Sequence, residues 1–218
     1  MLISGSAAPT PKITKATFLR VDVCRSDGTI IKHDVDIKAL RRFSNAAKAV
    51  LPIDNTTRDA DAANITYAIK PLGRRHPSDH AILGLLNRFE VIKHDNEPAV
   101  LRASDITGGL ALHVDVLAAC YALRVPFSIR PLEDDILKSI HDGPVTADQL
   151  AALWELLPSS NKLVAAIVQS LTHFYRVGEI ETEHNTELEK YIFNDDNLAK
   201  RFDAEAARQK AKGGGKAR

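Results

Sequence analysis

The sequence is poor in cysteine and in net charge, and both shortages restrict what the protein can be. Cys24 and Cys120 are the only cysteines among 218 residues, too few for a disulfide framework or a cysteine-rich zinc site. Each lies among apolar neighbours, which predicts a buried, reduced thiol. The formal net charge is only +1, so the molecule as a whole attracts nucleic acid or anionic lipid weakly.

Long apolar runs are also missing. No uninterrupted stretch approaches the length that spans a bilayer, and residues 1–11 lack the basic start and long apolar core of a secretory signal. We therefore expect a protein of the cytoplasm or nucleus with no membrane partner. The chain contains 44% hydrophobic and 26% charged residues, which is typical of a globular protein with a substantial buried core.

The N-terminal half predicts a small sheet accompanied by helices. Alternating apolar residues predict a strand over 17–24, and Asp27-Gly28 predicts the turn of a hairpin that returns over 29–35. The elements expected next are a helix over 37–51, a polar loop over 53–64, a strand over 65–69, a helix over 79–89 capped by Ser78, a short strand over 97–102 and a helix over 114–125.

The C-terminal half is expected to be helical throughout. Apolar stripes predict helices over 132–140, 150–157 and 163–174. A capping box, in which a Ser or Thr and the third helical residue bond reciprocally, is formed by Thr146 and Gln149 before the second of these.

A second capping box, Thr186 to Glu189, predicts another helix containing Leu188, Tyr191 and Ile192. Beyond Asp203 the chain is mainly Ala, Arg, Lys and Gly, which predicts a frayed helix and a flexible basic tail. The expected division is a flexible arm over 1–16, an α+β domain over 17–127, a helical extension over 128–202 and a basic tail over 203–218.

Side chains that could perform catalysis or bind a metal are scattered along the sequence. His76 and His80 are four residues apart, but Pro77 lies between them and no third ligand is near, which favours an exposed basic loop. His113 and Cys120 are seven residues apart on one expected helix, about 10.5 Å by helix rise, too far for a thiolate–imidazole pair. We therefore expect no catalytic, cofactor-binding or metal-binding residues, and a protein that is not an enzyme.

Residues 145–185 allow an alternative interpretation, a winged helix that binds nucleic acid. Two short capped helices are separated by residues 158–160, and a hairpin-like segment follows over 177–181. The second helix, over 161–174, carries Lys162 as its only lysine or arginine, whereas a recognition helix needs donors for phosphates and base edges. The charges thus argue against a nucleic-acid partner.

One segment after the hairpin resembles a motif of the BTB/POZ family. Residues 35–44 are similar to the family pattern apolar-His-Lys-x-x-Leu-x-x-x-Ser, with Leu40 and Ser44 in register. Asp36 stands where the family usually has histidine, and Ala47 stands where an aromatic residue is expected.

A second segment, residues 115–125, is similar to the apolar-leucine-x-x-alanine helix of the same family, in the form common among fungal BTB-like proteins. The resemblance covers roughly residues 17–175. It implies an α+β fold, with a BTB/POZ-like core of a small N-terminal sheet and helices followed by an all-helical C-terminal extension.

The resemblance also implies a function. Members of the family bind other proteins, often by self-association, and some are adaptors for cullin-type ubiquitin ligases. No specific cullin-contact motif is legible in this sequence. We therefore expect a non-catalytic protein–protein interaction module, a self-associating adaptor or scaffold whose partners are other proteins, including a second copy in a homodimer and a cullin-type ubiquitin ligase.

Overall fold

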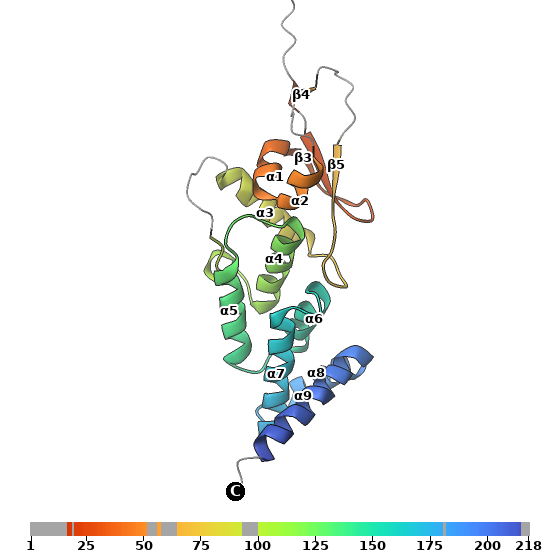
Figure 1. The fold of residues 1–218 in the computed structure, drawn as a ribbon, viewed down its shortest axis with the longest axis vertical. Coiled ribbons are helices and arrows are strands. Elements are labelled where there is room, and N and C mark those ends of the chain that lie inside the picture. The colour runs from red at the N-terminus through yellow and green to blue at the C-terminus, as the bar shows by residue number, and fades with distance from the viewer. Residues whose placement is uncertain are drawn as a thin grey trace, which may run out of the picture.

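The computed structural model describes residues 17–18, 20–51, 56–57, 65–92, 100–180 and 182–214. The expected arm over 1–16, most of the polar loop over 53–64, the first half of the expected strand over 97–102 and the last residues of the basic tail lie outside this described part. The described chain has the expected α+β layout, in which a small sheet near the N-terminus is followed by helices. In Figure 1 the sheet lies at one end of an elongated molecule, and α8 and α9 lie at the other.

Three strands form a mixed sheet, β2 (Arg20–Arg25), β3 (Ile30–Asp36) and β5 (Ile65–Ile69), in the order β3-β2-β5. β2 and β3 are antiparallel and form the predicted hairpin, whose turn contains Gly28 at φ 89°. β5 is parallel to β2 and lies on the other side of it from β3, so the chain passes from one edge of this sheet to the other between β3 and β5. β1 (Thr17–Phe18) and β4 (Thr56–Thr57) form a separate short antiparallel pair.

The single helix expected over 37–51 is wrong, because Ser44 divides it into α1 (Ile37–Phe43) and α2 (Asn45–Val50). The Ser44 backbone is extended, and its hydroxyl oxygen accepts a hydrogen bond from Ala47 N at 3.0 Å, as a helix N-cap does. The same hydroxyl donates to the Leu123 carbonyl at 2.7 Å. Ser44 is completely buried, so this bond attaches the start of α2 to the end of a distant helix.

Helices account for most of the remaining described chain, and none of those described combines the length and apolar character needed to cross a membrane. Their bounds are α3 (Asp79–Ile92), the 3-10 turn η1 (Ala103–Asp105), α4 (Leu110–Leu123), α5 (Arg130–His141), α6 (Ala147–Leu156), α7 (Lys162–Val177), α8 (Thr182–Phe193) and α9 (Asp196–Gly214).

α4 is the central helix of the molecule. It packs against α2, α3, α5 and α6, and most of its side chains are buried, including Leu117 and Cys120 at 0% exposure. Neighbouring helices therefore cover α4 on several sides. The Thr146–Gln149 capping box forms as expected, with Gln149 N donating to Thr146 Oγ1 at 3.3 Å.

Two expectations for the other segments are wrong. Val100 forms only an isolated parallel bridge with Ser128, and η1 follows where the strand over 97–102 was expected to end. α8 begins at Thr182, so Thr186 lies inside the helix and does not cap it. α9 continues to Gly214, well past Asp203, because it packs along α7. The basic tail expected over 203–218 is thus helical in its described part.

The loop before α3 crosses to the C-terminal half and contacts α6. The backbone N–H groups of Arg74 and Arg75 donate to the Glu155 carbonyl at 2.7 and 3.0 Å. This approach requires glycine at position 73, because a Cβ on Gly73 would lie 2.3 Å from the Glu155 oxygen. Two backbone hydrogen bonds thus join the N-terminal α+β part to the helical extension.

A group of four side chains reinforces this junction, and we call it the Trp154 cluster: Arg74, Trp154, Asp195 and Arg201. The Arg74 and Arg201 guanidinium carbons lie 4.6 and 5.5 Å from the centroid of the Trp154 ring. The indole N–H donates to Asp195 Oδ2 at 2.8 Å, and Arg74 also pairs with this carboxylate. Cation–π and charge-assisted contacts of this kind fix the relative positions of the loop, α6 and α9.

Candidate functional site

The two cysteines are buried in the core and make no disulfide. Cys24 is 2% exposed and Cys120 is 0% exposed. Burial raises the pKa of the Cys120 thiol to about 12, so the reactive thiolate is scarce near neutral pH. His113, the histidine on the same helix, places Nε2 3.3 Å from the Ile106 carbonyl oxygen. The structure therefore does not assemble a thiolate–imidazole pair from these residues.

His76 and His80 occupy different environments. His76 Nε2 lies 2.7 Å from Ser26 Oγ in the turn of the β2–β3 hairpin. His80 lies on the exposed side of α3. Among the side chains that the structure describes, no three His, Cys, Asp or Glu residues are grouped so that they could hold a metal ion.

The structure of residues 145–185 differs from the winged helix that the alternative interpretation requires. The hairpin expected over 177–181 is wrong, because Val177 ends α7, Gly178 caps it in the left-handed conformation, and α8 begins at Thr182. More than half of the residues of α7 are buried. Lys162 forms a salt bridge of 2.5 Å with Glu133, so its charge is already engaged within the protein.

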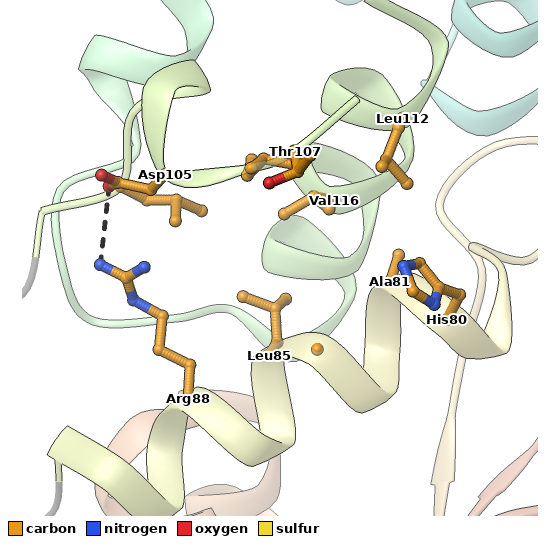
Figure 2. A pocket seen from close by; sticks show the side chains of 11 residues that line it. His80, Ala81, Leu85, Arg88, Asp105, Thr107, Leu112 and Val116 are labelled. Carbon is orange, nitrogen blue, oxygen red and sulfur yellow. Dashed lines mark ion pairs between the residues drawn. The ribbon is translucent and has the colours of Figure 1, made fainter. Parts of the chain in front are cut away.

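A small cavity lies between α3 and α4, beneath the turn formed by η1 and the residues that follow it. Figure 2 shows Leu85 and Val116 facing each other across it, with Arg88 and Asp105 at one end and His80 at the other. Its volume is about 290 Å³, near the lower end of the ligand-pocket range of about 300–1,000 Å³. It is lined by His80, Ala81, Gly84, Leu85, Arg88, Leu101, Asp105, Ile106, Thr107, Leu112 and Val116.

The start of α3 is capped by Ser78 and joined to α4 by one hydrogen bond. Ser78 Oγ accepts from Ala81 N at 3.2 Å, which confirms its predicted role as the cap of this helix. Ser78 N donates to Asp115 Oδ1 at 2.8 Å, and Asp115 belongs to α4. This bond joins the two walls of the pocket at one end.

η1 closes the third side of the pocket. Arg102 N donates to Asp105 Oδ2, and Ala103 N donates to Asp135 Oδ2, each at 3.0 Å. The glycine at position 108 then allows Leu112 to lie over the pocket, because a Cβ on Gly108 would lie 2.5 Å from Leu112 Cδ2. Residues 108 and 109, just before α4, therefore form a close-packed turn that shapes the pocket.

A pair of opposite charges borders the apolar interior. Arg88 Nη2 lies 3.6 Å from Asp105 Oδ2 and donates to the Val100 carbonyl at 3.3 Å. Both side chains are about one-third exposed, so water and a ligand can reach them. Thr107 adds a hydroxyl at the opening. The site therefore offers an apolar floor and a polar rim.

Gly84 opens the α3 side of the pocket to solvent. It is an exposed glycine inside a helix, where alanine would be more favourable by about 1 kcal/mol. A Cβ added at Gly84 meets no atom within 4 Å, so packing against the rest of the protein does not require glycine here. An isolated glycine within a helical pattern is the one signal in the sequence that points to this pocket.

No feature of the sequence marks the other pocket residues as part of a binding site. Arg88 and Asp105 are separated by residues that the structure does not describe in full, and their pairing follows from how α3 and η1 pack.

Comparisons of the chain with protein-family models, with curated proteins and with solved structures find no match. Function therefore has to be inferred from the residues and geometry of this chain.

Proposed function

We propose that this chain is a non-catalytic protein-interaction module of the cytoplasm or nucleus, an adaptor or scaffold whose pocket between α3 and α4 receives an apolar side chain of a partner protein. The observation that carries the proposal is the open apolar floor of this pocket, bordered by the Arg88–Asp105 pair. Protein interfaces combine an apolar centre with a polar rim, because apolar burial supplies free energy and rim contacts fix orientation.

The size of the pocket indicates how much of the binding it supplies. Burying one Leu, Phe or Met side chain contributes about 1.5–3 kcal/mol. That is far less than the roughly 8 kcal/mol of a micromolar complex, so the partner must also contact neighbouring surface. The pocket therefore acts as an anchor that selects a partner with an apolar side chain in the right position.

The BTB/POZ resemblance gives the proposal a second support. The two segments that carry the resemblance contact each other, since Ser44 donates to the Leu123 carbonyl at 2.7 Å. The next residue, Asn45, adds a bond from its N to the Arg124 carbonyl at 3.1 Å. Leu40, the other residue in register with the family motif, is fully buried. A second copy of this chain and a cullin-type ubiquitin ligase, the partners that the resemblance implies, are the first candidates to test.

Substitution at Gly84 tests the pocket directly. Gly84→Leu adds a branched apolar side chain at the opening, from a Cβ that meets no atom within 4 Å, whereas Gly84→Ala adds only that Cβ and serves as the matched control. The unsubstituted chain and the two variants are each immobilised, and the proteins that each captures from a cell extract are compared by quantitative mass spectrometry. Light scattering during size-exclusion chromatography measures self-association of the same three proteins.

The expected result is a partner, or a dimer, that Gly84→Leu weakens by about tenfold and Gly84→Ala leaves unchanged. A tenfold loss corresponds to about 1.4 kcal/mol, which is within the value of one buried apolar side chain. A chain that is strictly monomeric and captures nothing sensitive to Gly84→Leu contradicts the proposal. Circular dichroism of each variant excludes loss of folding as the cause.

A further inference from the structure

The Arg88 side chain at the rim of the pocket between α3 and α4 is incompletely bonded within the protein. An arginine carries several N–H donors, but with the described residues Arg88 makes one long hydrogen bond, from Nη2 to the Val100 carbonyl at 3.3 Å. Its Nε is buried and meets no acceptor in the described part of the chain. The 3.6 Å from Nη2 to Asp105 Oδ2 is too long for a hydrogen bond. The guanidinium therefore keeps donors for an incoming group.

Asp105 offers the complementary acceptor. Its Oδ2 accepts from Arg102 N at 3.0 Å, which holds the carboxylate in place at the end of η1. Within the described residues nothing is bonded to its Oδ1. In Figure 2 one terminal nitrogen of Arg88 meets the carboxylate, and the other lies on the side where Leu85 and Val116 face each other. Donors and an acceptor thus lie side by side at one end of the apolar floor.

The charges of this pair select against a charged ligand group. Arg88 and Asp105 carry opposite charges and lie together, so the pair as a whole is neutral. A charged group of the partner is attracted by one of the two side chains and repelled by the other. An uncharged group that has both a donor and an acceptor is bound by both. Since each side chain is about one-third exposed, such a group can reach them from the surface.

A polypeptide backbone supplies this group when it is extended. In a strand the N–H and C=O of one residue point to the same side, as they do where antiparallel strands exchange two hydrogen bonds. In an α-helix the same two groups point in opposite directions along the axis and are bonded within the helix. Of these two conformations, only the extended one presents a donor to Asp105 and an acceptor to Arg88 together. Its side chains leave the plane of these bonds on alternate faces.

We propose that the pocket binds a short extended segment of its partner protein. The C=O of one residue accepts from Arg88, the N–H of that residue donates to Asp105, and an apolar side chain of the segment enters between Leu85 and Val116. This inference rests on the proposed function and adds how the partner is held, by its main chain at the rim and by one side chain in the pocket. It excludes a helical segment as the occupant.

The test uses the full chain, isotope-labelled for two-dimensional NMR, and a capped, uncharged peptide of sequence Thr-Thr-Leu-Thr-Thr. Threonine favours extended backbone, and NMR measures the weak binding of a single anchored residue. Three matched peptides each change one feature. Alanine in place of leucine removes the anchor, N-methylation of the leucine removes its N–H, and α-aminoisobutyrate in place of threonine makes the backbone helical.

The parent peptide should shift the NMR signals of pocket residues such as Gly84 and Thr107. Each matched peptide should bind about fivefold more weakly or worse, since it loses a buried side chain or at least one hydrogen bond. Because the parent peptide is uncharged, its Kd should not depend on salt concentration. Signals that stay unmoved at millimolar parent peptide would overturn the inference, and so would N-methylated and helical peptides that bind as well as the parent.

Substitutions at the rim test the assigned roles. Arg88→Met removes the donors and keeps an unbranched stem, and Asp105→Ala removes the acceptor; each should weaken the parent peptide about fivefold. Arg130→Met is the matched control and should leave the Kd unchanged, because Arg130 is 84% exposed on α5 and does not line the pocket. In Asp105→Ala the penalty of N-methylation should disappear, which a purely structural effect of the substitution does not produce. A penalty that persists in full contradicts the inference.

Gly84→Leu distinguishes failure of this inference from failure of the proposed function. If Gly84→Leu and the alanine peptide both weaken binding while the backbone changes have no effect, the pocket anchors a side chain but the main-chain contact is wrong. If the leucine and alanine peptides bind alike and Gly84→Leu has no effect, both proposals fail. Should a rim variant lose its dispersed NMR spectrum, the comparison of peptides on the unsubstituted chain decides.

Discussion

Replacing Gly73 by alanine tests how firmly the N-terminal α+β part is joined to the helical extension. The new Cβ would lie 2.3 Å from the Glu155 oxygen and 2.6 Å from the Leu156 carbonyl carbon, both of them backbone atoms that cannot rotate away. The loop must therefore move outward and lose the two hydrogen bonds that Arg74 N and Arg75 N donate to Glu155.

The magnitude follows from these contacts. Each backbone hydrogen bond contributes about 0.5–1.5 kcal/mol, and displacing Arg74 from the Trp154 ring costs about 0.5–1 kcal/mol more. Alanine offsets about 0.4–1 kcal/mol of this loss, because it restricts the unfolded chain more than glycine does. We expect a net loss of about 2 kcal/mol in the free energy of unfolding. For a protein of this size that lowers the melting temperature by about 4–8 °C.

Urea unfolding followed by tryptophan fluorescence measures this loss, because Trp154 is the only tryptophan in the sequence and lies at the affected junction. Circular dichroism at the same urea concentrations reports the helices. Gly143→Ala is the matched control, since a Cβ at Gly143 meets no atom within 4 Å. The reasoning is refuted if Gly73→Ala and Gly143→Ala unfold at the same urea concentration.

Three further predictions concern Asp195, Leu117 and the two cysteines. Burial by itself raises the pKa of Asp195, but hydrogen bonds within the Trp154 cluster lower it to about 2, below its ordinary 3.8. Stability from this carboxylate is therefore present above about pH 4 and lost as the pH falls toward 2, and acid titrations of Asp195→Asn should lack this component; an unchanged acid profile would contradict it. Leu117→Ala, at a position with 0% exposure, should cost about 2–5 kcal/mol in urea unfolding, and a cost below about 1 kcal/mol would show that α4 is not the centre of the core. Cys24 and Cys120 should react with Ellman's reagent only after denaturation, since both are buried, so rapid labelling of the native protein would count against this packing.

The parts of the fold that the sequence predicts well depend on local chemistry. Asp27-Gly28 specifies a tight turn because Gly28 adopts a positive φ and the Asp27 carboxylate accepts from Thr29 N at 2.9 Å. Ser78 and the Thr146–Gln149 pair cap helices because their side chains satisfy N–H groups within a few residues. Such signals need no knowledge of the rest of the molecule.

The parts that the sequence does not predict depend on distant partners. Ser44 breaks the expected helix because its hydroxyl reaches the Leu123 carbonyl, 79 residues away in the chain. α9 continues past Asp203 because its side chains reach back to α7, as when Gln209 Nε2 donates to the Gln169 carbonyl at 3.0 Å. A weak or ambiguous local preference is decided by tertiary contact in both cases.

The candidate pocket shows why a binding site without reactive side chains is hard to foresee. Its walls come from α3, η1 and α4, and residues such as Leu85 and Val116 look like ordinary core positions in the sequence. They differ from core residues because one side chain beside them is absent: Gly84 has no side chain at a position where the helical pattern would place one. Sites of this kind consist of space left between elements, and that space is determined only once the elements have packed.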